Sequence, residues 1–141
     1  MDKWEALKRL LEELPEFGPE YQESVGHPDY DENGELLLHV VMGDLGRFYM
    51  SHGRGNAEIA ARFWRVVEEM AQEGDEAVEN AVHASLIEWF AWGDAAEQAA
   101  LLDASPRQGD ATTAMIGHYL PARGIGSRKS DRRRARMNRR P

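Results

Sequence analysis

Residues 56–90, NAEIAARFWRVVEEMAQEGDEAVENAVHASLIEWF, contain two consecutive helix patterns separated by a Gly-Asp turn. In the first pattern, Ala57 to Glu73, apolar residues recur at helical intervals and Asn56 is a suitable N-cap. In the second pattern, Glu76 to Trp92, Asp75 provides the cap and the later residues are apolar nearly all round. The stretch therefore predicts an all-α fold with the second helix near its centre.

Further helices are expected on both sides of this pair. The segment Asp2 to Leu14 has capping-box spacing at its start and ends before Pro15. The following segment, Glu16 to Glu35, is rich in Gly and Pro and is expected to be a long irregular connection. Capping and periodicity predict two more helices over residues 94–104 and 110–119.

The apolar segment Leu36 to His52 is predicted to be a buried helix, although Gly43 and Gly46 each disfavour a helix by about 1 kcal/mol relative to Ala. A short strand over Leu36–Met42 is the competing interpretation. With the helix, the sequence predicts a compact all-α bundle of about six helices. The pair at residues 56–90 also has the size of an α-solenoid unit, but no second copy with matching residues occurs.

The net charge of −8 conceals two parts of opposite sign. Residues 1–120 hold eight of the 17 basic residues and 24 of the 25 acidic ones, which is a net charge of −16. Residues 121–141 hold eight Arg, one Lys and one Asp, which is a net charge of +8. We therefore expect an acidic helical domain over residues 1–120, which attracts basic partners, and an Arg-rich tail over residues 121–141 that is disordered in isolation.

The composition also bears on the cellular compartment of the protein. There is no Cys, so no disulfide framework or thiolate metal site is expected. The charged N-terminal segment has no signal-peptide character, and no apolar run is long enough to span a membrane. These features predict a cytoplasmic protein with no membrane association.

No catalytic set or metal site is recognisable, and no cofactor is expected. The five His residues lack HxxxH or HExxH spacing, and the calcium-loop-like run that begins at Asp29 lacks the bidentate Glu at its twelfth position. We interpret His39 and His83 as hydrogen-bonded core residues, and Ser85 as bonded back to a helix carbonyl. An enzyme would need a cluster around His39, Asp44 and His83 that forms only on folding, so we favour a protein that is not an enzyme.

Three features are candidates for contact with a protein partner. Asp44 and Arg47 have the spacing of a pair on one helix, which is either a structural ion pair or a contact surface. Trp92 ends an apolar helix and, if exposed among acids, would be a binding hot spot. Acids around the Gly-Asp junction are the third feature, with a solvated helix start as the alternative. The candidate partner-binding residues are Asp44, Arg47, Glu68, Glu69, Glu73, Asp75, Glu76, Glu79 and Trp92.

The basic residues of the tail could bind phosphate backbones without sequence preference. They have no interleaved aromatic residues, so base stacking is not offered. A solubilising tail, or one that folds back on the acidic body, is an equal alternative. The candidate nucleic-acid-binding residues are Arg128, Lys129, Arg132, Arg133, Arg134, Arg136, Arg139 and Arg140.

Three motifs resemble an uncharacterised family of small helical bacterial proteins. They are LLLHVVMGDLGRF at residues 36–48, FWRVVEEM at 63–70 and GDEAVENAVHASLIEWF at 74–90. Members of that family look like immunity or antitoxin-type proteins of polymorphic toxin systems. The resemblance covers roughly residues 14–102, implies a helical fold and transfers no catalytic residue.

Together these observations favour a non-enzymatic, acidic protein-binding domain that neutralises a basic partner in the manner of an immunity protein. The alternative is a nucleic-acid-associated accessory protein anchored by its Arg-rich C-terminal tail. The first hypothesis predicts that residues 1–120 retain a basic protein. The second predicts binding with steep salt dependence that is lost without the tail.

Overall fold

A computed structural model of the chain describes residues 1–24, 31–32 and 35–120. Its elements, in chain order, are α1 (Lys3–Glu13), η1 (Pro15–Phe17), α2 (Gly18–Ser24), β1 (Asp31–Glu32), β2 (Glu35–Leu36), α3 (Leu38–Phe48), η2 (Tyr49–Gly53), α4 (Ala57–Glu73), α5 (Glu76–Ala81), η3 (Val82–Ile87), α6 (Glu88–Ala91), α7 (Ala95–Asp103), η4 (Ser105–Arg107) and α8 (Asp110–Tyr119). Here η1 and η4 are 3-10 turns, and η2 and η3 are π-helical. With α5, η3 and α6 taken as one continuous helix, this part of the chain forms seven α-helices, and the predicted all-α class is confirmed.

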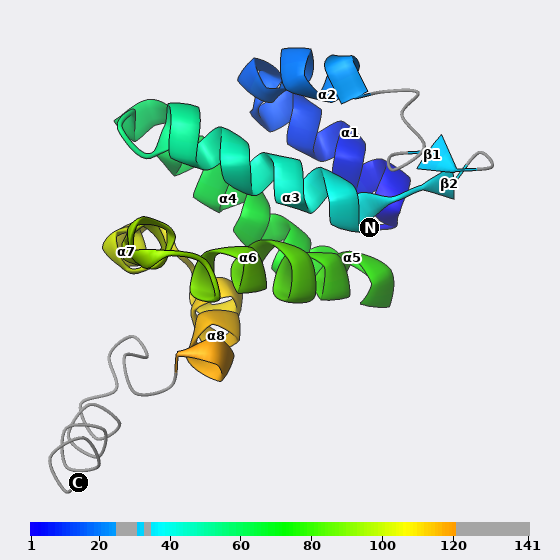
Figure 1. The fold of residues 1–141 in the computed structure, drawn as a ribbon. Coiled ribbons are helices and arrows are strands. Elements are labelled where there is room, and N and C mark those ends of the chain that lie inside the picture. Colours follow the sequence, from blue (N-terminus) through cyan, green and yellow to red (C-terminus); the bar gives the residue numbers. More distant parts are fainter. Residues whose placement is uncertain (25–30, 33–34, 121–141) are drawn as a thin grey trace, which may run out of the picture.

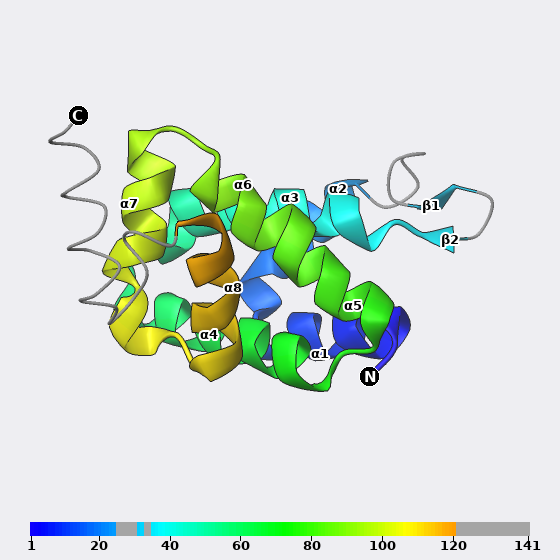
Figure 2. The same ribbon diagram turned by 90° about the horizontal axis from the view of Figure 1, so that it is seen from below.

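Helix α4 is the element around which the others pack. It contacts α1 and η2 on one side and α5, η3 and α8 on the other. The continuous helix from α5 to α6 runs alongside α3, and α7 and α8 lie at the α6 end of the molecule (Figures 1 and 2). Met1 lies at the opposite end, where the N–H of Asp75 donates to the carbonyl of Met1 at 2.8 Å.

Local sequence determines most of the helix starts. Asp2 and Glu5 form a complete capping box before α1, and Asp94 and Glu97 form another before α7. The Asn56 side chain accepts the N–H groups of Glu58 and Ile59, which fixes the start of α4. The predicted boundaries at these helices are therefore confirmed to within a residue or two.

A single hydrophobic cluster extends from Ala6 to Ile116. Its centre is aromatic: the Tyr49 ring is 4.4 Å from that of Phe63 and 5.5 Å from that of Trp64, and Trp64 is fully buried. The Tyr49–Trp64 pair is edge-to-face, a geometry that stabilises aromatic pairs beyond the area they bury. The described residues thus share one core.

Two sequence-based expectations need correction. The segment Glu16 to Glu35 is not wholly irregular, because η1 and α2 occupy its first part. Gly18 and Pro19 misled the prediction, since Pro is tolerated in the first turn of a helix, where its missing N–H removes no hydrogen bond. The prediction of about six helices omitted α2 for the same reason.

The competing strand over Leu36–Met42 is wrong, because α3 begins at Leu38 and only Leu36 belongs to a strand. Gly46 inside α3 has a packing role. A Cβ on Gly46 would lie 2.7 Å from Cε3 of Trp89, so glycine lets α3 and α6 approach closely.

Predictions for the Arg-rich tail and for half of the calcium-loop-like run Asp29–Leu36 fall on residues 25–30, 33–34 and 121–141, which lie outside the described residues. Within the described residues, no helix combines the length and the apolarity that crossing a bilayer requires.

Candidate partner-binding face

The exposed side of the α5–α6 helix, with the residues that follow it, carries the most site-like features of the described chain. We call it the Trp92 face and define it by Glu76, Glu79, His83, Glu88, Trp92 and Glu97. Two hollows lie along it, one at the α4–α5 junction and one beside Trp92.

The charge of this region is entirely acidic. Residues 66–106 contain no Lys or Arg, while they contain ten Asp or Glu residues. Bases from outside the stretch pair with two of these acids, Glu69 and Asp103, and the other eight form no ion pair with a Lys or Arg among the described residues, so the stretch as a whole has a negative local potential. The absence of Lys and Arg is visible in the sequence and identifies the region more directly than the individual acids considered there.

Trp92 is 69% exposed and lies at the end of α6. It borders a hollow of about 500 Å³ with Glu88, Trp89 and Glu97 on its walls and Gly43 of α3 opposite. The sequence left the exposure of Trp92 open, and the structure shows that this side chain is exposed. Trp is enriched among the residues that contribute most of the binding energy at the centres of protein interfaces.

A polar cluster holds the Trp92 ring in place. The Tyr119 ring meets that of Trp92 edge-on at 5.6 Å, and its hydroxyl lies 2.9 Å from Nδ1 of His83 and 3.4 Å from a carboxylate oxygen of Glu88. Burial and the charge of Glu88 raise the pKa of Tyr119. Tyr119 thus connects α8 to η3 and α6 and was not among the residues predicted from sequence.

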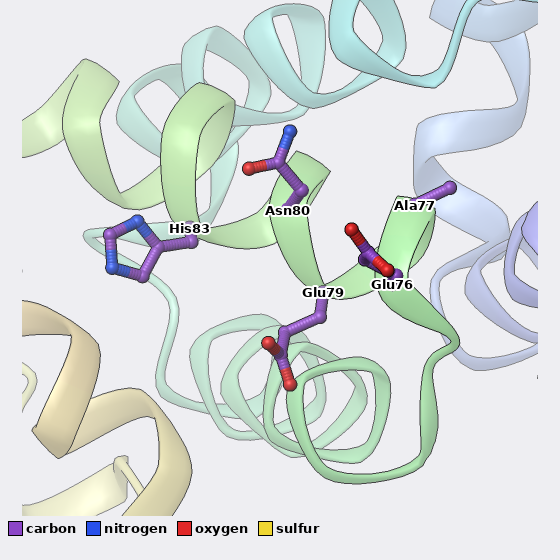
Figure 3. A pocket seen from close by; sticks show the side chains of 5 residues that line it. All are labelled: Glu76, Ala77, Glu79, Asn80 and His83. Carbon is purple, nitrogen blue, oxygen red and sulfur yellow. The ribbon is translucent and has the colours of Figure 1, made fainter.

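The second hollow, of about 560 Å³, is lined by Glu76, Ala77, Glu79, Asn80 and His83 (Figure 3). In Figure 3 the side chains of Glu79 and Asn80 extend to opposite sides of the helix, and that of His83 extends toward α8. Neither Glu76 nor Glu79 has a hydrogen-bonding or ion-pair partner for its carboxylate among the described residues. These two acids are therefore available to an external cation.

Glu68, by contrast, is engaged by the chain itself. Its carboxylate accepts the backbone N–H groups of Ala111 and Thr112, both at 2.9 Å, and the amide of Gln72 at 2.7 Å. Burial raises the pKa of Glu68, but hydrogen bonds led by the N–H of Thr112 outweigh burial, and the pKa is lowered overall. Gly109 makes room for this contact, because a Cβ there would lie 2.4 Å from Cδ of Glu68.

Three other predicted acids have mixed roles. Glu69 is ion-paired with Arg9 of α1 at 2.8 Å, and the Asp75 side chain caps α5 through the N–H of Val78. Glu73 is exposed, and its side chain has no partner in the described part of the chain. The acids near the α4–α5 junction therefore form two groups: those bonded within the fold and those free to bind a partner. Their spacing in the sequence did not reveal this division.

Asp44 and Arg47 form the ion pair that their spacing predicted. They lie on α3, where Asp44 directly follows Gly43, a residue that lines the Trp92 hollow, and Arg47 lies one turn after Gly43. The structure thus places this pair beside the Trp92 face rather than at the α4–α5 junction.

The residues considered for enzymatic chemistry are not brought together. His39 is exposed rather than in the core, and its Nδ1 contacts the Ser85 hydroxyl, so Ser85 is not bonded back to its own helix as predicted. His83 is half-buried against Tyr119, and Asp44 contacts Arg47. Among the described residues no group of three or more His, Asp or Glu side chains has the arrangement of a metal site.

The fold and this face define a small, acidic, all-helical domain with an exposed Trp among acidic residues on one side. A family model described as a domain of unknown function (DUF7674) matches residues 7–105, so the chain belongs to that family. No match was found among curated proteins, and none among solved structures.

Proposed function

We propose that this domain binds a basic protein partner through the Trp92 face. One observation carries the proposal: a 69% exposed Trp at the edge of an acid-walled hollow, within a stretch of 41 residues that has no Lys or Arg. A partner Arg or Lys would meet the Trp92 ring for a cation–π contact and the carboxylates of Glu88 and Glu97 for charge pairing.

The available acids at the other end of the face support the same partner chemistry. Glu76 and Glu79 extend the negative surface along α5, and charges at the rim of an interface chiefly raise the association rate. Trp92 would supply most of the binding energy, and the charges of Glu76 and Glu79 would attract the partner. A basic partner would therefore be expected to lie along the helix from Glu76 to Trp92.

Immunity-type neutralisation is the specific form of this proposal, in which the domain occludes the functional site of a basic toxin. The motif at residues 74–90, one of the three that carry the resemblance to immunity-type proteins, lies along the Trp92 face. Family membership itself names no partner, so the partner has to be identified by experiment.

The experiment starts with full-length tagged protein, host lysate with and without nuclease treatment, and mass spectrometry, with three baits: wild type, Trp92→Ala and Trp4→Ala. Trp4 is a matched control, because it is 50% exposed in the first turn of α1, and the start of α1 lies at the opposite end of the molecule from α6. Any basic protein that Trp92→Ala fails to retain is then purified and its affinity measured directly at low and high salt.

We expect Trp92→Ala to weaken the affinity by about 30-fold or more, which is the loss of roughly 2 kcal/mol typical of a hot spot, and Trp4→Ala to leave it unchanged. We expect the affinity to fall with salt, and less steeply in Glu76→Gln/Glu79→Gln. Equal retention by both Trp variants would reject the proposal. Retention that disappears with nuclease would support nucleic-acid association through the tail instead.

A further inference from the structure

A third hollow, of about 350 Å³, lies away from the Trp92 face, where η2, the first turn of α4, α7 and η4 meet. Figures 1 and 2 show α7 next to the C-terminal end of α3, where η2 follows. The lining of this hollow includes Tyr49, Arg54, Gly55, Ala57, Asp103 and Arg107. Unlike the Trp92 face, this hollow is rich in hydrogen-bond donors.

Two of the eight bases in residues 1–120 lie on this wall. Arg107 is exposed, and its guanidinium has no partner among the described residues. Arg54 approaches Asp103 only to 3.5 Å, and that carboxylate is 74% exposed, so the pair is weak. Both guanidinium groups are therefore available to an anion.

The start of α4 adds a backbone donor. The Asn56 side chain accepts the N–H groups of Glu58 and Ile59, each at 3.1 Å, but the N–H of Ala57 has no acceptor in the described part of the chain. Helix α4 has 17 residues, so its N-terminus carries the partial positive charge of a full helix dipole.

Tyr49 supplies an independent indication of a ligand. Only 3% of this residue is exposed, and its ring packs against Phe63 and Trp64, yet it lines the hollow. Its hydroxyl has no hydrogen-bond partner among the described residues, and it is not sealed from solvent. A ligand in the hollow would replace water as the acceptor for this hydroxyl.

We propose that this hollow binds a phosphate monoester. Two guanidinium groups, one hydroxyl and one helix N-terminal N–H form a set of donors that suits a tetrahedral dianion, and Arg binds phosphate oxygens through paired N–H groups. Asp103 is the one acidic group on the wall and releases Arg54 when the anion binds. This site is independent of the proposed partner-binding function.

The test is a titration of the full-length protein with inorganic phosphate, followed by ¹⁵N NMR at the amides of Gly55 and Ala57. Chloride at equal ionic strength is the control for salt. We expect saturable shifts with phosphate and none with chloride. A local amide readout separates this site from any binding of phosphate by the Arg-rich tail.

The variants sharpen the test. Arg54→Gln and Arg107→Gln should each weaken phosphate binding by about five-fold or more, and Asp103→Asn should strengthen it. Arg65→Gln is the matched control, because Arg65 also lies on α4 but faces Glu13 of α1. Tyr49→Phe should weaken binding about two-fold without changing the melting temperature, since the hydroxyl has no internal partner to lose.

Shifts that grow linearly without saturation, equal shifts with chloride, or equal weakening in Arg65→Gln would overturn the proposal. Phenyl phosphate is then compared with inorganic phosphate. Binding at least as tight as that of inorganic phosphate supports a monoester, and exclusion of the phenyl compound overturns that ligand class.

Discussion

The interface between α1 and α4 and the Trp92 face use glutamate in opposite ways. Arg62 of α4 donates hydrogen bonds to both carboxylate oxygens of Glu16, which follows α1 in η1, at 2.8 and 2.6 Å. Arg9 of α1 forms an ion pair with Glu69 of α4 at 2.8 Å. On the Trp92 face, none of the four Glu residues forms an ion pair with an Arg or Lys of the described chain. The same side chain therefore fastens helices together in one region and remains available for binding in the other.

This difference shows what charge counting misses. A carboxylate becomes structural when the fold brings a donor from another helix to it, and the donor can be more than forty residues away in the chain, as Arg62 is from Glu16. A carboxylate with no such donor remains able to attract a positively charged group of another protein. The predictions below test this division, in order of expected effect.

Glu68→Ala should have the largest effect on stability. It leaves the N–H groups of Ala111 and Thr112 at the start of α8 without an acceptor, so we expect a loss of about 2 kcal/mol in the free energy of unfolding. Chemical denaturation measures this loss, and Glu73→Ala is the control, because Glu73 is exposed on the same helix. Equal losses in both variants would remove the distinction between structural and available acids.

Arg62→Met should cost about 1 kcal/mol in the free energy of unfolding. The substitution keeps the apolar stem but removes the bonds to Glu16 and to the carbonyl of Glu13. Arg54→Met is the control, because its partner Asp103 is distant and exposed, and it should change stability by less than about 0.5 kcal/mol. The prediction fails if denaturant midpoints of the two variants coincide.

The pairing of Glu16 should also appear in the pH dependence of stability. Its hydrogen bonds with Arg62 lower the pKa of Glu16 to about 2. A folded pKa below the unfolded value of about 4.3 means that the pair stabilises the protein above that value, and that this contribution is lost as the pH falls toward about 2.

The difference in unfolding free energy between wild type and Arg62→Met should therefore shrink across this pH range. Because Glu16 is partly exposed, the change should stay below about 1 kcal/mol. Thermal melts from pH 6 to pH 2 measure it. Glu16→Gln serves as the second variant and should show the same pH dependence as Arg62→Met; a constant difference from wild type would contradict the assignment.

The smallest effect on stability is expected on the Trp92 face. Glu76→Gln/Glu79→Gln should change the free energy of unfolding by less than about 0.5 kcal/mol, since neither carboxylate has a partner among the described residues. Their removal should instead slow association with a basic partner and flatten its salt dependence. A clear loss of stability in this variant would show that these acids are structural after all.

Most of the helices could be predicted from sequence because their determinants are local. Capping boxes at Asp2 and Asp94 and the cap at Asn56 act within four residues, and they appear in the structure as predicted. The error at α2 arose where Gly18 and Pro19 were read as a connection although they begin a helix. The place of Trp92 at a helix end left its exposure open, and only the structure decided it.

The functional surface could be predicted only in part. By itself the sequence determined an acidic, helical chain with no Lys or Arg over residues 66–106, because composition and periodicity are properties of the chain. Only the tertiary structure decided that Glu68 caps α8, that Tyr119 supports Trp92 and that Tyr49 reaches a hollow with Arg107. These contacts join residues tens of positions apart, and their partners are set by how helices pack, which no local pattern encodes.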